Sequence, residues 1–294
     1  MKVNRTCVLI DEGNLTEHVD WKVAHQAIIE AINGVIWPPN NPEGLFKIHR
    51  ITTFRSPTKH KPATKSKPAV EYKPGTEYVT LKGKTATWKG KTTNFRNGVV
   101  PLRQTFRKNM ERTTNWKAEK PLSLAAYFES IRESRQAKIH LYPSGEVITE
   151  ILNESVGDFD FWFKSNDEFR VVVEWETGNI SSSHRSINKM CLALMAGLAD
   201  AAVIIVPSGM LAPHLTDRIG NIRELQPYFN LWKAVAHRVG KGLLAFIEVE
   251  QDETVNTHDL RDFIPSGSDG NSKKKSKTRS QAKKKVKKPV GNSR

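Results

Sequence analysis

The sequence is poor in the features that stabilise secreted or membrane-embedded proteins. It has only two cysteines, Cys7 and Cys191, in 294 residues, so we expect no disulfide framework and a reducing cytosol. Its longest apolar runs, such as 201–206, are far too short to span a bilayer. The apolar patch at 7–10 runs straight into acidic residues and is too short for a signal peptide. We therefore expect a cytoplasmic protein with no membrane partner.

Glycine-rich phosphate loops and closely spaced metal ligands are missing as well. No glycine pattern matches a phosphate-cradling loop or a dinucleotide site. His184, Cys191 and His214 do not have the spacing of a zinc site. Apolar residues nevertheless make up 38% of the chain and aromatic residues 8%, which excludes a wholly disordered protein. The length corresponds to one large domain or two small ones.

Positive charge is abundant but unevenly distributed. The chain has 46 basic and 31 acidic residues, and the net charge of +15 indicates a polyanionic partner such as nucleic acid. Residues 47–96 have a net charge of +11, residues 271–294 also have +11, and the remainder has −7. We therefore expect two basic segments attached to a slightly acidic body.

These two basic segments differ in kind. Lysines in 47–96 are interspersed with aromatic residues and with period-two runs around Gly83, a pattern that predicts short β-hairpins beside a Lys/Pro-rich linker near 57–70. Such a surface suits a phosphate backbone, and the alternative interpretation is an ordinary solvated hairpin. Residues 271–294 contain no acid, which predicts a disordered tail that adds either non-specific DNA affinity or only solubility.

Hydrophobic periodicity predicts an α/β fold. Helices are predicted at 21–32, 101–116, 121–133, 183–198 and 221–235. Strands are predicted at 138–142, 146–152, 158–163, 169–176, 201–206 and 243–249. Strands that alternate with helices in the second half indicate a central mixed β-sheet flanked by helices.

Acidic residues gather where 158–163 and 169–176 form a predicted hairpin. Glu174 and Glu176 are two residues apart, so they share one face of a strand, while Trp175 points to the other. An adjacent strand of the hairpin ends at Asp160, which places three carboxylates near one another. Magnesium prefers such oxygen ligands, and a metal ion there promotes phosphodiester hydrolysis. The alternative is that the two glutamates form the solvated face of an edge strand.

The residues that follow carry a resemblance to a known family. The stretch 174–189 reads EWETGNISSSHRSINK and resembles the central segment of the BamHI family of type II restriction endonucleases. Further matches, in family order, lie at 98–101, 115–122, 215–218, 224–229 and 264–270, and more weakly at 36–38. The resemblance implies a restriction-endonuclease-like fold of the PD-(D/E)xK type, acting as a homodimer on palindromic double-stranded DNA.

The resemblance also implies a metal site. Asp160 and Glu174 would hold a divalent cation, Mg²⁺, helped by the backbone carbonyl of Trp175. The family aspartate follows Pro-Ile, whereas here the match reads Asp158-Phe159-Asp160, so Asp158 stays open as an alternative to Asp160.

Two more acidic residues complete the implied catalytic set. Glu176 stands where most relatives of the fold carry lysine, and it becomes the candidate general base or water-orienting group. Glu119 becomes a fourth acidic residue that lines the site. The set Asp160, Glu174, Glu176 and Glu119 is intact, which argues against a decayed site.

DNA recognition is implied by a further group of matches. The residues are Asn179, Ser181 and Arg185 at a helix start facing the major groove, Asp217 and Arg218 in a loop that reads the outer base pairs, and Gly267 and Asp269 in a segment that enters the minor groove. Arginine reads guanine and a carboxylate accepts from cytosine N4. The implied target is GGATCC, cut after the first G to leave four-base 5′ overhangs. The alternative for Asn179 and Ser181 is plain helix capping.

The chain is therefore divided into four segments. Residues 1–46 are the N-terminal helical region of the nuclease domain, 47–96 a basic insertion, 97–270 the nuclease core and 271–294 the tail. We expect the enzyme in a bacterial cytoplasm, with a cognate DNA methyltransferase as its functional partner. The competing hypotheses are a non-catalytic sequence-specific DNA-binding protein and a nuclease of the same fold with altered specificity.

Overall fold

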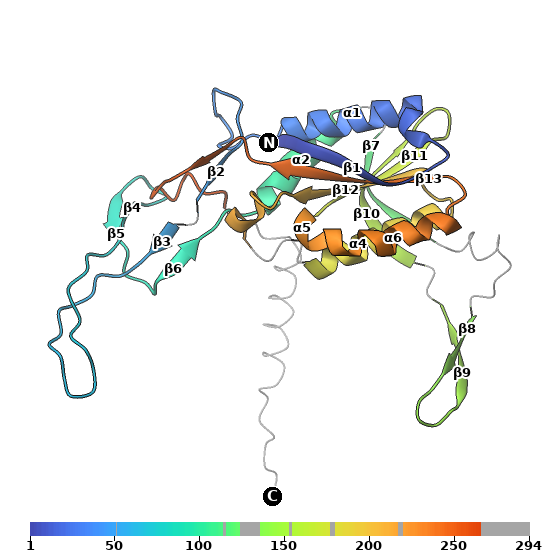
Figure 1. Cartoon of the computed structure of the whole chain (residues 1–294). Helices are drawn as coiled ribbons and strands as arrows, with labels where there is room; N and C mark the ends of the chain where they lie inside the picture. Colours follow the sequence, from blue (N-terminus) through green and yellow to red (C-terminus); the bar gives the residue numbers. More distant parts are fainter. Residues whose placement is uncertain are drawn as a thin grey trace, which may run out of the picture.

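A six-stranded sheet forms the centre of the molecule (Figure 1). The computed structural model describes residues 1–50, 52–113, 116–123, 136–152, 155–176, 180–216 and 220–265. The strand order is β1 (Lys2–Glu12), β13 (Gly242–Glu250), β12 (Ala201–Pro207), β11 (Arg170–Trp175), β10 (Ser155–Lys164) and β7 (Trp116–Ser123). Strands β11, β12 and β13 are parallel, whereas β1, β10 and β7 pair antiparallel with their neighbours. The predicted mixed sheet is confirmed.

Helices cover both faces of this sheet (Figure 1). The helices are α1 (Val19–Asn33) and α2 (Val100–Glu111) on one face, and α4 (Ile180–Met195), α5 (Ile222–Leu225) and α6 (Phe229–Lys233) on the other. Short 3-10 turns lie at Leu15–Glu17, Ala212–His214, Gln226–Tyr228 and Ala234–Arg238. Because both faces are covered, the apolar run of β12 is buried along its whole length, as its composition predicts.

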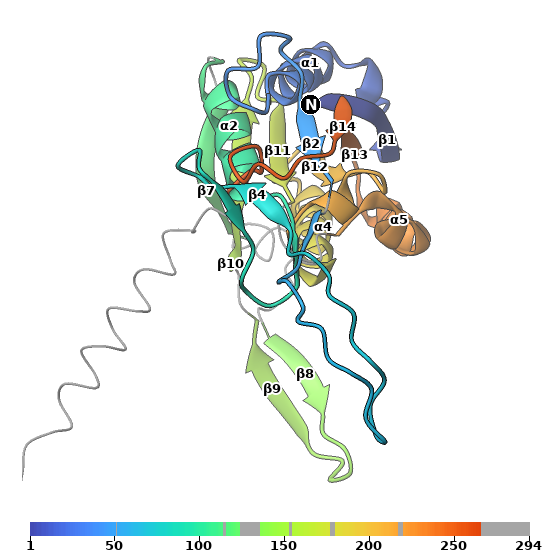
Figure 2. The same cartoon turned by 90° about the vertical axis from the view of Figure 1, so that its left-hand side faces the viewer.

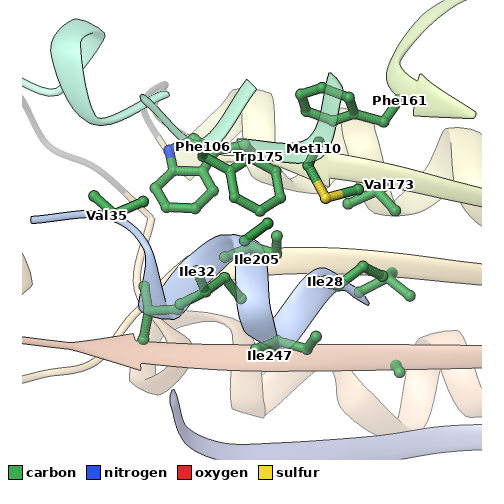
Figure 3. Packing of buried hydrophobic residues seen from close by; sticks show 14 of the residues in the cluster. Ile28, Ile32, Val35, Phe106, Met110, Phe161, Val173, Trp175, Ile205 and Ile247 are labelled. Carbon is green, nitrogen blue, oxygen red and sulfur yellow. The ribbon is translucent and has the colours of Figure 1, made fainter. Parts of the chain in front are cut away.

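The core on the α1 and α2 side determines how the end of β11 is held (Figure 3). Ile28 and Ile32 of α1 and Phe106 and Met110 of α2 are completely buried against the sheet. The ring of Phe106 lies 4.5 Å from that of Trp175, centroid to centroid. Strand β11 therefore ends in a tightly packed indole, which fixes the direction of the residues on either side of it.

Outside the sheet the chain forms small two-stranded pairs. They are β2 (Lys47–His49) with β14 (Glu253–Val255), β3 (Thr52–Phe54) with β6 (Thr93–Phe95), β4 (Glu77–Val79) with β5 (Thr85–Thr87), and β8 (Gln136–His140) with β9 (Val147–Ile151). The β4–β5 pair is the hairpin predicted around Gly83 within the basic insertion. The β8–β9 pair is the predicted hairpin at 138–152.

Three sequence-based predictions need correction. Residues 1–46 supply an edge strand, β1, as well as a helix. Of the helix predicted at 121–133, residues 121–123 belong instead to β7, and 124–135 lie outside the described residues. Strand β7 is at the edge of the sheet, where Pro121 is tolerated because its missing N–H is not needed by a second neighbour.

The helix predicted at 221–235 is broken into α5, α6 and two 3-10 turns, because Pro227 cannot continue an α-helical ladder. The predicted tail at 271–294 lies outside the described residues. Within the described portion of the chain, no helix is long and apolar enough to cross a membrane.

Candidate active site

Strands β10 and β11 separate at the acidic residues. Their antiparallel ladder runs from Lys164↔Arg170 to Phe161↔Val173 and stops there. The next residues along the two strands are Asp160 and Glu174. A carboxylate therefore stands on each strand at the point where the main-chain hydrogen bonds between them end.

Asp160 is held by two hydrogen bonds from different elements. One carboxylate oxygen accepts from the guanidinium of Arg103 on α2. The other accepts from the backbone N–H of Trp175 at 2.9 Å. The side chain of Asp158, in contrast, is exposed. The geometry thus supports Asp160 rather than Asp158 as the residue that faces Glu174.

Glu174 is almost buried and lies beside an ammonium group. Its side chain is 10% exposed, and Oε1 accepts from Nζ of Lys189 on α4. Burial raises the pKa of the Glu174 carboxyl to about 7, and the charge of Asp160 adds to this rise while Lys189 opposes it. Two acids and one ammonium thus share a poorly solvated space.

Lys189 makes several contacts that fix its position. Its Nζ also donates to the backbone carbonyl of Asp158 at 2.5 Å and lies 4.3 Å from the centroid of the Phe159 ring. Neither Lys189 nor Arg103 was predicted to belong to the site. The sequence did indicate that Lys189 is largely buried, because it lies on the same face of the helix as Ser186 and Ala193, and a buried lysine needs an acidic partner.

Glu176 is the third acid brought to this end of β11. Its side chain is 7% exposed, Oε1 accepts from the Ser182 hydroxyl at 2.9 Å, and its N–H donates to the Ile205 carbonyl at 3.0 Å. It also borders a cavity of about 20 Å³, large enough for a single water molecule, between Leu102 and Val249. Glu176 is therefore buried and fixed in position, and does not lie on a solvated face.

Glu119 lies on β7 beside this site. The register pairs Ala118 with Phe161 and Lys120 with Phe159, so Glu119 is opposite Asp160 in the backbone. Its side chain lies outside the described residues. The backbone alone thus places a fourth acidic residue next to the strand that carries Asp160.

The donor set suits a hard cation. Among the residues that the structure describes, no three His, Cys, Asp or Glu side chains converge closely enough to hold a metal ion. Two of the acids are instead paired with protein cations, Asp160 with Arg103 and Glu174 with Lys189. Buried carboxylates that each need a positive charge fit a site for an oxygen-preferring divalent ion.

Comparisons with known proteins bear on this site. The profile of the family described as Restriction endonuclease BamHI matches residues 1–271. The chain belongs to the BamHI family of restriction endonucleases. It is 36% identical to the type II restriction enzyme BamHI of Bacillus amyloliquefaciens over 179 residues, 60% of this chain and 69% of that enzyme. The resemblance inferred from the sequence is confirmed.

Two further proteins match parts of this BamHI-family chain. The type II restriction enzyme OkrAI of Oceanobacter kriegii is 45% identical over 98 residues, which is 33% of this chain. The chain spans about half of OkrAI, 48% of its length. A crystal structure of the restriction endonuclease BglII with a DNA 16-mer aligns with a TM-score of 0.43 and 10% identity, over 84% of this chain and 79% of that one.

The structure describes two of the residues that the BamHI family implies for DNA recognition. Ser181 and Arg185 are exposed and lie one turn apart on the first turns of α4. Asn179, Asp217, Arg218, Gly267 and Asp269 lie outside the described residues. Gly220 packs directly on Ser183, where a Cβ would collide with the hydroxyl. Gly220, the first described residue after 217–219, therefore lies in contact with the first turn of α4.

Asn97 connects segments of this chain that lie near the predicted recognition residues. Its fully buried amide donates to the carbonyl oxygens of His49 at 2.8 Å and His214 at 3.0 Å, and accepts from the N–H of Ile264 at 3.2 Å. The Asn97 carbonyl accepts from Thr216 N–H at 2.7 Å. One side chain thus joins segments that precede both predicted reading loops, a role that no local pattern indicates.

Proposed function

We propose that this protein is a type II site-specific endonuclease that hydrolyses phosphodiester bonds of palindromic double-stranded DNA in the presence of Mg²⁺. The proposed target is GGATCC, cut after the first G to leave four-base 5′ overhangs. The observation that carries the proposal is that Asp160, Glu174 and Glu176 lie at the same end of the sheet in a BamHI-family chain, where burial raises the pKa of Glu174 and the charges of Asp160 and Glu176 are near enough to raise it further. Acids gathered in a poorly solvated space need positive charge beside them, and a divalent ion supplies it.

The residues have distinct proposed roles. Asp160 and Glu174, with the carbonyl of Trp175, would hold the ion, and the Trp175 N–H keeps the Asp160 carboxylate turned toward the site. When bound, Mg²⁺ supplies positive charge that orients water, lowers its pKa and offsets the charge developing on the phosphodiester. Arg103 and Lys189 neutralise the two acids until the ion arrives.

Water activation is assigned to Glu176. Ser182 fixes its carboxylate by a hydrogen bond, so the group is oriented before substrate binds. From this position Glu176 orients the attacking water or takes its proton. Glu119, opposite Asp160 in the backbone, is proposed as the fourth acidic residue of the site.

Sequence reading is assigned to residues separate from the acids. They are Asn179, Ser181 and Arg185 at the start of α4, Asp217 and Arg218 in the loop after His214, and Gly267 and Asp269 beyond β14. Exposed Arg185 has the planar donor geometry that pairs bidentately with guanine. Base readout and hydrolysis thus use different side chains.

The biological setting follows from the proposed reaction. A palindromic target is read most simply by a protein with two-fold symmetry, so we propose a homodimer. The host must protect its own DNA, so we propose a cognate DNA methyltransferase as functional partner. We propose that the endonuclease and the methyltransferase both act on DNA in the bacterial cytoplasm.

A plasmid with a single GGATCC site tests the proposal. Purified protein with Mg²⁺ should convert the plasmid to a linear product, whereas EDTA or a changed base in the site should prevent cleavage. Sequencing of the ends should give the G/GATCC position. Sedimentation of the protein alone and on DNA should show a dimer, and a monomer in both states would contradict the proposed symmetry.

Two outcomes would favour the competing hypotheses. Tight binding to GGATCC without cleavage in Mg²⁺ would identify a non-catalytic DNA-binding protein. Cleavage at a different sequence would identify an endonuclease of the same fold with altered specificity. In that case the match at Asp217 and Arg218 would not be enough to determine the target sequence.

A further inference from the structure

Residues 57–73, called here the basic arm, form a long hairpin within the insertion. In Figure 1 it is the blue-to-cyan loop at the lower left, and Figure 2 shows it extending away from the body. Its two strands are joined by bridges at Thr58↔Lys73, Lys61↔Val70 and Thr64↔Lys67, with backbone hydrogen bonds of 2.8 to 3.3 Å. The arm is thus a defined hairpin that ends in a tight turn.

The arm buries no side chain of its own. Every residue from 59 to 74 is exposed, and even Tyr72 is 64% exposed. A two-stranded hairpin in water is at best marginally stable, and most hairpins gain stability by burying one face. The arm therefore adds nothing to the core, and its surface is open to a partner molecule.

The composition of the arm selects one kind of contact. It has five lysines and a single acid, Glu71, and it contains no Arg, Asn or Gln. Those three missing residue types have the planar side chains that pair with a base edge through two fixed hydrogen bonds, whereas lysine is a flexible point charge that suits phosphate. The arm is equipped for a phosphate backbone and not for sequence readout.

Aromatic rings anchor the base of the arm. Phe54 is completely buried, and its ring centroid lies 4.5 Å from that of Phe95, 5.4 Å from Trp88 and 5.6 Å from Tyr78. Phe95 in turn lies 5.9 Å from Phe263, which belongs to the C-terminal region of the body. This cluster binds the strands on either side of the arm into one unit.

Close backbone packing further fixes the base. A Cβ at Gly75 would come within 2.7 Å of both Pro57 and Thr87, so only glycine allows the arm to leave the cluster here. Val79 N–H donates to the carbonyl of His258, and its own carbonyl accepts from Leu260, both at 3.1 Å. The base of the arm is therefore fixed to the body by packing and hydrogen bonds, and not connected to it by a flexible linker alone.

The base of the arm lies at the same end of the sheet as the acids. Strands β11 and β13 both run parallel to β12, so their carboxyl ends face the same way. Strand β11 ends at the acidic site, and β13 leads to the segment around His258 that holds the arm. In Figure 1 the arm emerges on the side toward which the β13 arrow points.

We propose that the basic arm binds the phosphate backbone of DNA outside the recognition site, without regard to its sequence. This inference rests on the proposed function, which makes the bound molecule a DNA duplex that contains the recognition site. It adds that tight binding needs duplex DNA beyond that site. A hairpin with six or seven residues in each strand reaches about 20 Å. That reach corresponds to about six base pairs of duplex, at about 3.4 Å for each pair.

Four arm lysines provide the test variant. Lys59, Lys61, Lys65 and Lys67 are changed together to Gln, and a charge-matched control carries Lys2, Lys22, Lys108 and Lys241 changed to Gln, all exposed elsewhere on the body. Because all eight side chains are exposed, both variants should keep the thermal stability of the unchanged protein. Glu71→Lys provides a variant with the opposite change in charge.

Binding is measured in EDTA, without cleavage, on GGATCC duplexes with flanks of about three or about fifteen base pairs. The unchanged protein and the control should bind the long duplex at least tenfold more tightly than the short one. The arm variant should lose most of this preference. Its slope of log Kd against log salt on the long duplex should fall by about seven, because the proposed dimer loses four lysines from each of two arms. Glu71→Lys should increase the preference for long flanks.

Equal flank preference and equal salt dependence in the arm variant and the unchanged protein would overturn the proposal. Cleavage of the short duplex in Mg²⁺ separates this inference from the proposed function. The arm variant should cut that duplex at the unchanged rate. If no form of the protein cuts any duplex, the proposed function fails, whereas the binding comparison still decides the role of the arm.

Discussion

The ammonium group of Lys189 binds the carboxylate of Glu174 in a space where both side chains are about nine-tenths buried, with exposures of 11% and 10%. Lys189 comes from α4 and Glu174 from β11, so the pair joins a helix to the end of a central strand. Arg103 makes the equivalent pair with Asp160. Each of these two acids thus carries its own protein cation.

Removal of one acid should separate catalysis from recognition. Glu174→Ala should abolish cleavage of a GGATCC plasmid in Mg²⁺ while specific binding in EDTA stays within about threefold of the unchanged protein, because base contacts come from other side chains. Binding is measured by competition against a duplex with a changed site. Loss of both activities in this variant would refute the separation.

Lys189 should matter most when no metal ion is present. Lys189→Met leaves the Glu174 carboxylate buried without its ammonium partner. Because the raised pKa lets this carboxyl take up a proton and so avoid part of the cost, we expect the free energy of unfolding in EDTA to fall by only about 1–3 kcal/mol. Added Mg²⁺ should recover much of the loss, because it binds only the folded chain. Urea unfolding measures this, with Lys189→Arg as the charge-retaining control. A loss that Mg²⁺ leaves unchanged would contradict the assignment.

The raised pKa of Glu174 predicts how stability depends on pH. Below pH 4.5 the group is protonated in the folded and unfolded states alike. Between 4.5 and about 7 only the unfolded chain releases the proton, so the folded state loses stability as pH rises. At about 1.4 kcal/mol for each pH unit, the loss is roughly 3 kcal/mol.

In EDTA, Glu174→Gln should therefore flatten the fall in stability between pH 4.5 and 7. Urea unfolding at several pH values is the measurement, and the exposed Glu12→Gln serves as the control. Parallel pH profiles for Glu174→Gln and the unchanged protein would show that Glu174 does not titrate in this range.

Asn97 should be intolerant of an isosteric change. Asn97→Asp replaces two donors by a carboxylate that faces the carbonyl oxygens of His49 and His214, in a position with no access to solvent. We expect a loss of about 3 kcal/mol or more in unfolding free energy. At a temperature where the variant stays folded, discrimination against altered GGATCC sites should fall at least tenfold. Unchanged discrimination would mean that Asn97 acts on stability alone.

The lysine-rich tail should affect affinity and not the choice of site. Deletion of 271–294 removes 11 basic residues, so general DNA affinity and its salt dependence should both decrease. The position of the cut, determined by sequencing the ends, should stay the same. A shifted cut position would show that the tail contributes to sequence choice.

Much of the fold followed from local patterns. The continuous apolar runs of β12 and β13 predicted buried strands, because a strand covered on both faces needs apolar side chains at every position. The spacing of Glu174 and Glu176, with Asp160 on the facing strand, predicted the acidic group. Strand β1 was missed because its burial is mixed along an edge, where no clear period identifies it.

The amino-acid sequence by itself determined the mixed α/β class, the basic hairpin around Gly83 and the membership of the BamHI family. Only the tertiary structure decided which cation neutralises which acid and which amide joins the segments before the predicted reading loops. Arg103 and Asp160 are 57 residues apart, and Asn97 and Ile264 are 167 apart. Contacts between residues so far apart in the sequence depend on how the helices and strands pack together, and local sequence patterns do not predict that packing.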